Sequence, residues 1–296
     1  MTGRLEYRQV DVFTDEPYRG NPLAVVHGAD ALSAAQMQRV ANWTNLSETA
    51  FLLAPSRPDA DYRVRIFTPV AELPFAGHPT IGSCHAWLEA GGAATGDVAG
   101  DVVGDVVVQE CAAGLVRVRR TDGRLAFAAP PLLRSGPVDG PILERVAASL
   151  RIGRDEIVDA EWIDNGPGWV GVLLRDAAAV LALRPGVVDL DIGVAGLHPD
   201  GAPSAVEVRA FFPKDGATVE DPVTGSLNAS VAGWLLRTGR VRAPYVATQG
   251  AALGRAGRVH VSTSDDGVLW VGGDAVTCIL GSIALGPGST ASAARP

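Results

Sequence analysis

The chain carries one short pattern twice, and this duplication limits the folds open to it. Residues 78–83 (HPTIGS) and 221–226 (DPVTGS) share the spacing His/Asp-Pro-x-x-Gly-Ser and lie 143 residues apart (221 minus 78). Upstream, residues 64–69 (VRIFTP) parallel residues 208–213 (VRAFFP) at an offset of 144 (208 minus 64). We therefore predict two similar lobes, each with a strand, a turn and a helix in this order.

Length and charge point to a two-lobed protein that acts on a small molecule. With 296 residues and a hydrophobic content of 47%, the chain can bury two cores. Lys plus Arg number 25 against 33 Asp plus Glu, which gives a formal net charge of -8. No basic cluster alternates with aromatic residues, so the sequence lacks the pattern of a protein that binds nucleic acid or an anionic membrane. We expect a small molecule as the partner.

The cysteines do not suggest a metal site. Cys84, Cys111 and Cys278 are scattered and odd in number, with no CxxC pair and no His/Cys spacing typical of zinc. We expect reduced thiols and no metal. No nucleotide-binding or phosphate-binding motif is present, so the sequence does not indicate an NTPase or a nicotinamide-dependent enzyme. The N-terminus enters an alternating strand without an apolar leader, and nowhere do about 18 apolar residues run together. These features predict a soluble, cytoplasmic protein.

Short apolar runs dominate the first half. They predict strands at 5–14, 22–27, 49–54, 61–68, 105–111, 115–120 and 124–128. Ser33 is a candidate N-cap for a helix after the second strand. Its apolar residues Met37, Val40 and Trp43 recur at helical spacing, which directs them toward the core. A second helix follows the HPTIGS turn and ends at the glycine pair 91–92.

The second half repeats the theme after a proline-rich stretch at 130–141, which predicts a linker. Helices are expected near 141–150 and 225–237, strands near 157–164, 169–175 and 205–212, and three closing strands after them. We divide the chain into an N-terminal lobe at 1–129, a C-terminal lobe at 130–286 and a flexible tail at 287–296. The last strand of the second lobe can pair back to the first.

The predicted elements favour one fold class. Strands outnumber helices and do not alternate with them regularly, as they would in a doubly wound sheet. The helix after each repeated turn is apolar nearly all round, as a helix enclosed by a sheet requires. We predict an α+β fold of two pseudo-symmetric lobes, each a mixed β-sheet or barrel wrapped around a central α-helix.

The repeated turn has the chemistry of an anion site. Proline is tolerated at the first helical position, and the Gly-Ser pair leaves backbone N–H groups uncovered, so each helix start can hold a carboxylate. Such a helix end contributes about 0.3–1 kcal/mol, and up to ~2 when partly buried. Alone, His78 and Asp221 also fit a structural turn residue and an ordinary N-cap. If the lobes face each other, the two residues lie across one cleft that suits an amino or hydroxy acid.

Longer motifs resemble the PhzF-like isomerases, which share the diaminopimelate epimerase fold. The resemblance rests on VDVFT at 10–14, GNPLAVV at 20–26, NLSETAF at 45–51, RIFTP at 65–69, ELPFAGHPT at 72–80, NGP at 165–167 and EDPVTGS at 220–226. These motifs are ordered and spread over nearly the whole chain. They are therefore far more specific than a lone glycine loop.

The resemblance implies a cofactor-free isomerase with its site between two lobes, and a homodimer. The predicted catalytic set is Glu48, which matches the family's acid/base, with His78 and Asp221, which match its polar substrate-binding residues. Positions that match backbone or hydroxyl contacts to the substrate are Ser47, Gly77, Gly225 and Ser226. Asn21 and Asn165 lie in similar Asn/Gly/Pro turns before a strand, and we predict that both line the cleft. In the namesake reaction a carboxylate moves a proton on trans-2,3-dihydro-3-hydroxyanthranilate, on the way to phenazines.

Several alternatives stay open at this point. The related epimerases use two cysteines, one at each repeated turn, and both turns here are thiol-free, which disfavours a two-thiol racemase. On sequence alone Glu48 also fits a solvated or capping carboxylate. Residues 96–105 resemble a metal loop but lack its ligand spacing, so we predict a solvated loop there. A non-catalytic protein that binds a small metabolite or a partner through the same cleft is the alternative function, and phenazine synthesis is one of several possible pathways.

Overall fold

The structure is a computed structural model that describes residues 3–94 and 106–284. Its contacts divide the chain into two compact units. The first unit comprises the described residues of Met1–Tyr18, Pro22–Phe127 and Asp274–Pro296, and the second comprises Arg19–Asn21 and Ala128–Gly273. Helices and strands mix in both units, so the fold is α+β with mixed sheet pairing.

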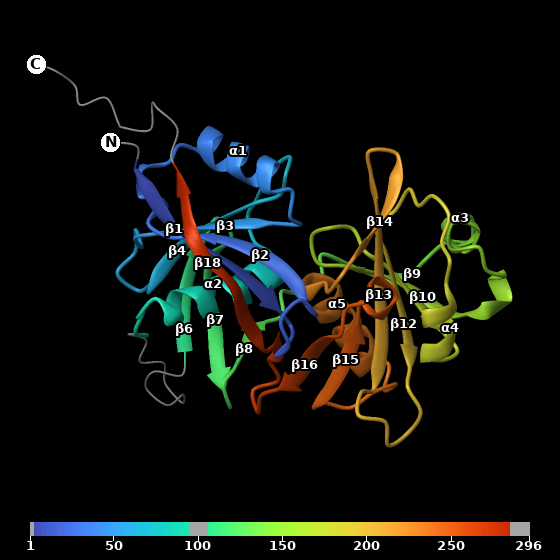
Figure 1. Cartoon of the computed structure of the whole chain (residues 1–296). Coiled ribbons are helices and arrows are strands. Elements are labelled where there is room, and N and C mark those ends of the chain that lie inside the picture. Colours follow the sequence, from blue (N-terminus) through green and yellow to red (C-terminus); the bar gives the residue numbers. More distant parts are fainter. Residues whose placement is uncertain (1–2, 95–105, 285–296) are drawn as a thin grey trace, which may run out of the picture. The chain divides into compact units, whose positions relative to one another are not determined.

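The first unit combines parallel and antiparallel strand pairs, and Figure 1 shows its elements. Its elements are β1 (Arg4–Val12), β2 (Asn21–Val26), the 3-10 helix η1 (Ala29–Ala31), α1 (Ala34–Thr44), β3 (Thr49–Leu53), β4 (Tyr62–Phe67), β5 (Glu72–Leu73), α2 (Gly77–Glu89), β6 (Val106–Cys111), β7 (Gly114–Thr121), β8 (Arg124–Ala128) and β18 (Ala275–Ala284). The pairs β2–β3 and β4–β6 are parallel, whereas β3–β4, β4–β5, β6–β7 and β7–β8 are antiparallel. The last strand, β18, pairs antiparallel with β1.

The second unit repeats this order of pairing. Its elements are β9 (Arg134–Pro137), α3 (Gly140–Leu150), η2 (Arg154–Glu156), β10 (Ile157–Asp164), β11 (Val170–Leu174), α4 (Ala177–Ala182), β12 (Ile192–Leu197), β13 (Val206–Lys214), β14 (Ala217–Asp221), α5 (Gly225–Arg237), β15 (Tyr245–Gln249), η3 (Ala251–Leu253), β16 (Gly257–Thr263) and β17 (Leu269–Gly273). The pairs β11–β12 and β13–β15 are parallel, and β12–β13, β13–β14, β15–β16 and β16–β17 are antiparallel. The duplication therefore extends to the direction of each pairing.

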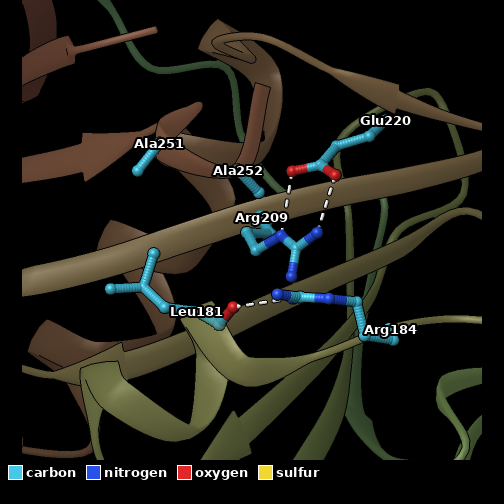
Figure 2. Close-up of a pocket in the computed structure, with 6 residues that line it drawn as sticks. All are labelled: Leu181, Arg184, Arg209, Glu220, Ala251 and Ala252. Carbon is cyan, nitrogen blue, oxygen red and sulfur yellow. Dashed lines mark hydrogen bonds and ion pairs between the residues drawn. The ribbon is translucent and has the colours of Figure 1, made fainter. Parts of the chain in front are cut away.

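The duplication reaches single side chains in the hairpins β4–β5 and β13–β14. Arg65 donates two hydrogen bonds to Glu72, and Arg209 donates two to Glu220 (Figure 2). Each arginine also lies over the ring of the phenylalanine two residues later. The arginines are 144 residues apart (209 minus 65), but the glutamates are 148 apart (220 minus 72). Four additional residues therefore lie between the arginine and the glutamate of the second hairpin, where they extend the paired strands to Lys214 and Ala217.

This insertion changes the register of the repeat at the helices. Helices α2 and α5 both contain 13 residues and begin 148 residues apart (225 minus 77). His78 is the second residue of α2, whereas Asp221 ends β14, four residues before α5 begins (225 minus 221). The interpretation of His78 and Asp221 as equivalent positions is therefore wrong. The structural counterpart of His78 is Ser226, 148 residues later.

The Gly-Ser pair of the first copy does not open a helix start either. Gly82 and Ser83 are buried inside α2. A Cβ added to Gly82 would lie 2.6 Å from Leu23 Cδ2 and 2.9 Å from Val12 Cγ2, so this glycine allows α2 to pack closely on β1 and β2. In the second copy, by contrast, Gly225 is the first residue of α5. The Gly-Ser pair thus allows close helix packing in the first unit, whereas in the second unit it begins the helix.

Strands cover the central helix of each unit (Figure 1). Helix α2 contacts β1, β3, β6, β7 and β18, and α5 contacts β10, β12, β16 and β17. In both helices nine of the 13 residues are buried. This enclosure explains why both segments are apolar nearly all round.

Helix α1 begins after its predicted N-cap, but one of the residues that we predicted to be buried faces solvent. The Ser33 hydroxyl accepts from Gln36 N in a capping box. Met37 is buried and Val40 packs beside it, but Trp43 is 83% exposed. The core prediction for Trp43 is wrong because each step of three residues stops about 60° short of a full turn on a helix of 3.6 residues per turn. After two such steps the side chain has left the buried stripe.

The predicted linker contains part of the second unit. Strand β9 pairs with β10 in this stretch, and the contacts separate the units between Phe127 and Ala128. The predicted loop at 96–105 and the tail at 287–296 lie outside the described residues. Within the described ranges, none of the helices has the length and apolar character needed to cross a membrane.

Two glycine substitutions test the close packing of α2. In Gly82→Ala the added methyl group must displace the buried Leu23 side chain, so we expect the free energy of unfolding to fall by about 1–3 kcal/mol. Gly233→Ala in α5 is the matched control, because no atom lies within 4 Å of its added Cβ. That change should raise stability by about 0.5–1 kcal/mol. Urea unfolding of both variants measures the difference, and equal effects would contradict the packing role of Gly82.

Candidate active site

The predicted site residues gather at the starts of α2 and α5, each within its own unit. The helices begin at Gly77 and Gly225, and neither N-cap residue places a side-chain hydrogen bond on the first turn. The first N–H groups of a helix have no partner within the helix, and the helix dipole favours negative charge there. Each start can therefore accept a carboxylate.

In the first unit, Glu48 and His78 lie in contact. Glu48 Oε2 is 3.0 Å from His78 Nδ1, and the side chains are 18% and 5% exposed. Asn45, with a φ of 54°, ends α1 and directs the chain through the exposed Ser47 to Glu48, just before β3. His78 is fixed by α2 as its second residue. A carboxylate and an imidazole are both groups that can take up and release a proton.

Two buried atoms of this pair lack a hydrogen bond within the described residues. These atoms are Glu48 Oε2 and His78 Nε2. The contact between Oε2 and Nδ1 has the distance of an ion pair but not the angles of a hydrogen bond, so we describe it as an ion-pair contact. A buried polar group without a partner costs about 1–3 kcal/mol. Both atoms are therefore suited to meet a ligand or a water molecule.

In the second unit, Asp221 accepts hydrogen bonds on both carboxylate oxygens. Asn21 Nδ2 lies 3.1 Å from Oδ1, and Thr224 Oγ1 lies 2.5 Å from Oδ2. Asn21 is fully buried and also donates to the Val223 carbonyl at 2.9 Å. Donors on both oxygens fix the orientation of the carboxylate and favour its charged form.

Ser226, the second residue of α5, is held from the turn after β10. Asn165 Nδ2 donates to the Ser226 carbonyl at 2.9 Å, and Trp169 Nε1 donates to its hydroxyl at 3.2 Å. Because the hydroxyl accepts this bond from Trp169, its own proton is free to point to another acceptor. The hydroxyl is thus arranged to donate to an oxygen of a ligand.

Two amide oxygens beside α5 are left without a donor. Asn21 Oδ1 and Asn165 Oδ1 are buried, and no described residue donates to them. Their orientation is fixed because each Nδ2 points to a backbone carbonyl, a place that an amide oxygen cannot take. Both oxygens can therefore accept from an amino or hydroxyl group of a ligand.

A pair of carboxyl groups supports the turn that carries Asn165. Asp164 Oδ1 accepts from the N–H groups of Gly166 and Gly168 at 2.7 and 2.8 Å. Burial, and to a lesser degree the charge of Asp164, raises the pKa of nearby Asp191 to about 6. The Asp191 carbonyl, just before β12, accepts from Val170 N at the start of β11.

Sequence reasoning missed three residues of the second half-site, namely Thr224, Trp169 and Gln249. Thr224 lies inside the repeated DPVTGS pattern and could have been found there. Trp169 directly follows the NGP turn and its glycine, where a large aromatic residue is conspicuous. Gln249 closes an apolar strand and gave no signal beyond being polar in a buried run.

The cavity shown in Figure 2 lies at another place in the second unit. It has a volume of about 400 Å³ and is lined by Leu181, Arg184, Arg209, Glu220, Ala251 and Ala252. Arg184 and Arg209 both donate to the Leu183 carbonyl after α4, and Glu220 already pairs with Arg209. These side chains stabilise the end of α4 and the hairpin. No predicted site residue lines this cavity.

The available proton-transfer groups are carboxylates and an imidazole. Cys84 and Cys111 are buried, and burial raises the pKa of both thiols. The N-cap positions of α2 and α5 hold Ala76 and Thr224. Across residues 3–94 and 106–284, no group of three or more His, Cys, Asp and Glu side chains could hold a metal ion.

The raised pKa of Asp191 predicts a pH dependence of stability. Because this pKa lies above its ordinary value of 3.8, the penalty for charging Asp191 in the folded state grows as pH rises from about 4 to about 6. The wild type should therefore lose unfolding free energy over this interval relative to Asp191→Asn, and the difference should be constant above it. Urea unfolding of both proteins from pH 3.5 to 8 measures this. A difference that does not vary with pH would contradict the prediction.

Known proteins resemble the chain over nearly its whole length. A family model described as "Phenazine biosynthesis-like protein" (PhzC-PhzF) matches residues 10–281. "Antisense-enhancing sequence 1" of Schizosaccharomyces pombe is 35% identical, covering 93% of this chain and 97% of that protein. The trans-2,3-dihydro-3-hydroxyanthranilate isomerase of Pseudomonas aeruginosa is 35% identical, covering 88% and 91%. A PhzF-family phenazine biosynthesis protein of Bacillus anthracis has the same fold, with a TM-score of 0.77 at 22% identity over 95% of this chain and 99% of that one.

Proposed function

The chain belongs to the phenazine biosynthesis-like PhzC-PhzF family, whose members include isomerases, and from this premise we propose a specific reaction. The protein is a cofactor-independent isomerase that moves one proton on a small cyclic or unsaturated amino or hydroxy acid. The first candidate substrate is trans-2,3-dihydro-3-hydroxyanthranilate, for which the Pseudomonas aeruginosa relative is named. Its six-membered ring carries a carboxylate, an amino group and a hydroxyl group.

The contact of 3.0 Å between Glu48 and His78 carries this proposal. In the proposed step the Glu48 carboxylate takes a proton from a ring carbon, the electron pair shifts along the conjugated system, and the proton returns to another carbon. His78 Nδ1 faces the carboxylate that holds the proton, and Nε2 faces the substrate. The proton is neither gained nor lost over the cycle, so no co-reactant is needed.

The start of α5 supplies the groups that bind the substrate. The Gly225 and Ser226 N–H groups and the Ser226 hydroxyl suit a carboxylate. Asn21 and Asn165 provide the two free amide oxygens, which suit amino and hydroxyl donors. Asp221, with its fixed carboxylate, orients a donor of the substrate. In the first unit Gly77 and Ser47 add N–H and hydroxyl groups beside Glu48.

Both helix starts enter the proposal. Glu48 and His78 act on the substrate, and Asp221 and Ser226 bind it. The starts of α2 and α5 both lack a side-chain hydrogen bond from their N-cap residue, which supports the use of both. We also propose that the active protein is a homodimer.

A second candidate is a binding or interaction protein that uses the same cleft without efficient chemistry. One observation favours it: the Schizosaccharomyces pombe relative has a name that refers to antisense enhancement and to no reaction. Exchange of carbon-bound hydrogen separates the two candidates. Binding without exchange for every acid tested would support the second.

Glu48→Gln tests the proposed base directly. The amide keeps the shape of the side chain but cannot take a proton, so the rate of isomerisation should fall by about 10²–10⁴-fold. Proton NMR in deuterium oxide with trans-2,3-dihydro-3-hydroxyanthranilate measures both product formation and deuterium uptake at carbon. Glu144→Gln, the same change on the exposed face of α3, is the control and should leave the rate unaltered. An unchanged rate in Glu48→Gln would rule out this role.

Blocking the thiols separates this mechanism from a two-thiol racemase. Cys84 and Cys111 are buried and the reaction does not use them, so methyl methanethiosulfonate should leave turnover intact. Mass spectrometry of the treated protein reports which cysteines have reacted. Loss of activity on modification of a single cysteine would favour thiol chemistry instead.

A further inference from the structure

Gln249, the last residue of β15, makes four hydrogen bonds around the start of α5. Its side chain is 1% exposed. Oε1 accepts from Thr224 N at 3.0 Å and from Asn228 Nδ2 at 2.8 Å. Nε2 donates to the Asp221 carbonyl at 3.1 Å and to Thr224 Oγ1 at 3.0 Å. This side chain thus joins the Asp221 backbone, Thr224 and Asn228 in one hydrogen-bond network.

The direction of each hydrogen bond in this network is determined. Thr224 N can only donate, so the group of Gln249 that faces it must be the oxygen, and the amide nitrogen must face Thr224 Oγ1. Because Thr224 Oγ1 accepts from Gln249, its single proton goes to Asp221 Oδ2, 2.5 Å away. Gln249 therefore decides which way the threonine hydroxyl points.

The first unit contains a similar glutamine with a different outcome. Gln109 on β6 is fully buried and donates to Thr80 Oγ1 at 3.0 Å, near the start of α2. The Thr80 hydroxyl donates to the Ala76 carbonyl, however, and not to a carboxylate. Both units thus place a buried glutamine and a threonine near a helix start, but not at equivalent positions, because the residue 148 positions after Thr80 is Asn228. Of the two threonine hydroxyls, the one in the second unit donates to an acidic side chain.

We infer that Gln249 is a positioning residue that acts on Asp221 through the hydroxyl of Thr224. Gln249 directs the Thr224 hydroxyl so that it donates a hydrogen bond to Asp221 Oδ2. This hydrogen bond favours the ionised carboxylate and fixes its orientation beside the first turn of α5. It also holds the Asp221 backbone through the carbonyl, so that β14 ends at a constant distance from the helix. The inference deepens the proposed function and rests on it where it concerns turnover. The hydrogen-bond arrangement itself can be tested without a substrate.

The first arm of the experiment observes the Asp221 carboxyl carbon by NMR in protein labelled with ¹³C-aspartate. Hydrogen bonds to the charged form favour it. In the wild type the signal should therefore keep its ionised position to lower pH than in Gln249→Met or Thr224→Val. The double variant should add nothing to either single change. Gln109→Met is the matched control, because it also removes a buried glutamine but one in the first unit. It should leave the Asp221 signal unaltered.

The second arm measures turnover on trans-2,3-dihydro-3-hydroxyanthranilate. Gln249→Met and Thr224→Val should each lower kcat by about tenfold or more, as loss of a supporting hydrogen bond at a reactive group does. Thr224→Ser keeps the hydroxyl and should retain activity. In Asp221→Asn protein the substitution at Gln249 should have little further effect. If the Gln249 substitution lowers kcat by the same factor in Asp221→Asn protein as in the wild type, Gln249 acts only on general stability.

The two arms distinguish the failure of each proposal. A wild type that turns over no substrate would refute the proposed function, while the carbon signal would still decide the role of Gln249. An Asp221 signal that titrates identically in wild type and Gln249→Met would overturn the inference even in an active enzyme. If Gln249→Met does not fold, Gln249→Glu replaces it. This variant keeps the oxygen that accepts from Thr224 N but loses the donor when ionised, so the Asp221 signal should again leave its ionised position at a higher pH than in the wild type.

Discussion

The enclosure of one helix by the sheet of each unit constrains everything else in this molecule. Nine of the 13 residues of α2 and of α5 are buried, so side chains along these helices are committed to packing. The polar residues of the candidate site accordingly lie at the helix starts and at the ends of neighbouring strands. Glu48 precedes β3, Asp221 ends β14 and Gln249 ends β15. The neighbouring strands thus place these groups beside the first turn of each helix, where the N-cap residue makes no side-chain hydrogen bond.

The two halves share a frame but have diverged in chemistry. The Arg-Glu pairs of the hairpins and the order of strand pairing are retained in both. At the helix start, however, the first unit places an imidazole against a glutamate, whereas the second clamps an aspartate between an asparagine and a threonine. The four additional residues lengthen the hairpin β13–β14 beyond the Arg209–Glu220 pair, so that pair and the order of strand pairing are unchanged. In the proposed function, this divergence makes one half the proton-transfer pair and the other the binding pair.

The sequence predicted the general fold and most residues of the candidate site, because long motifs and apolar periodicity depend on local neighbours. It failed where tertiary packing decides. The matching letters at 78–83 and 221–226 suggested an offset of 143, but hairpin pairing sets the true offset at the helices. Trp43 followed a three-residue spacing that drifts off the buried face of α1. Gln249 could not be foreseen, since its role depends on a strand that meets α5 only in the folded chain.

The central proposal is that Glu48 and His78 act on a small acid. A crystal structure with 3-hydroxyanthranilate, an aromatic analogue with the same carboxylate, amino and hydroxyl groups, tests it most directly. We predict a bound ligand with its carboxylate on the N–H groups of a helix start and with Glu48 or His78 in direct contact with the ligand. A ligand that touches neither Glu48 nor His78 would contradict the account.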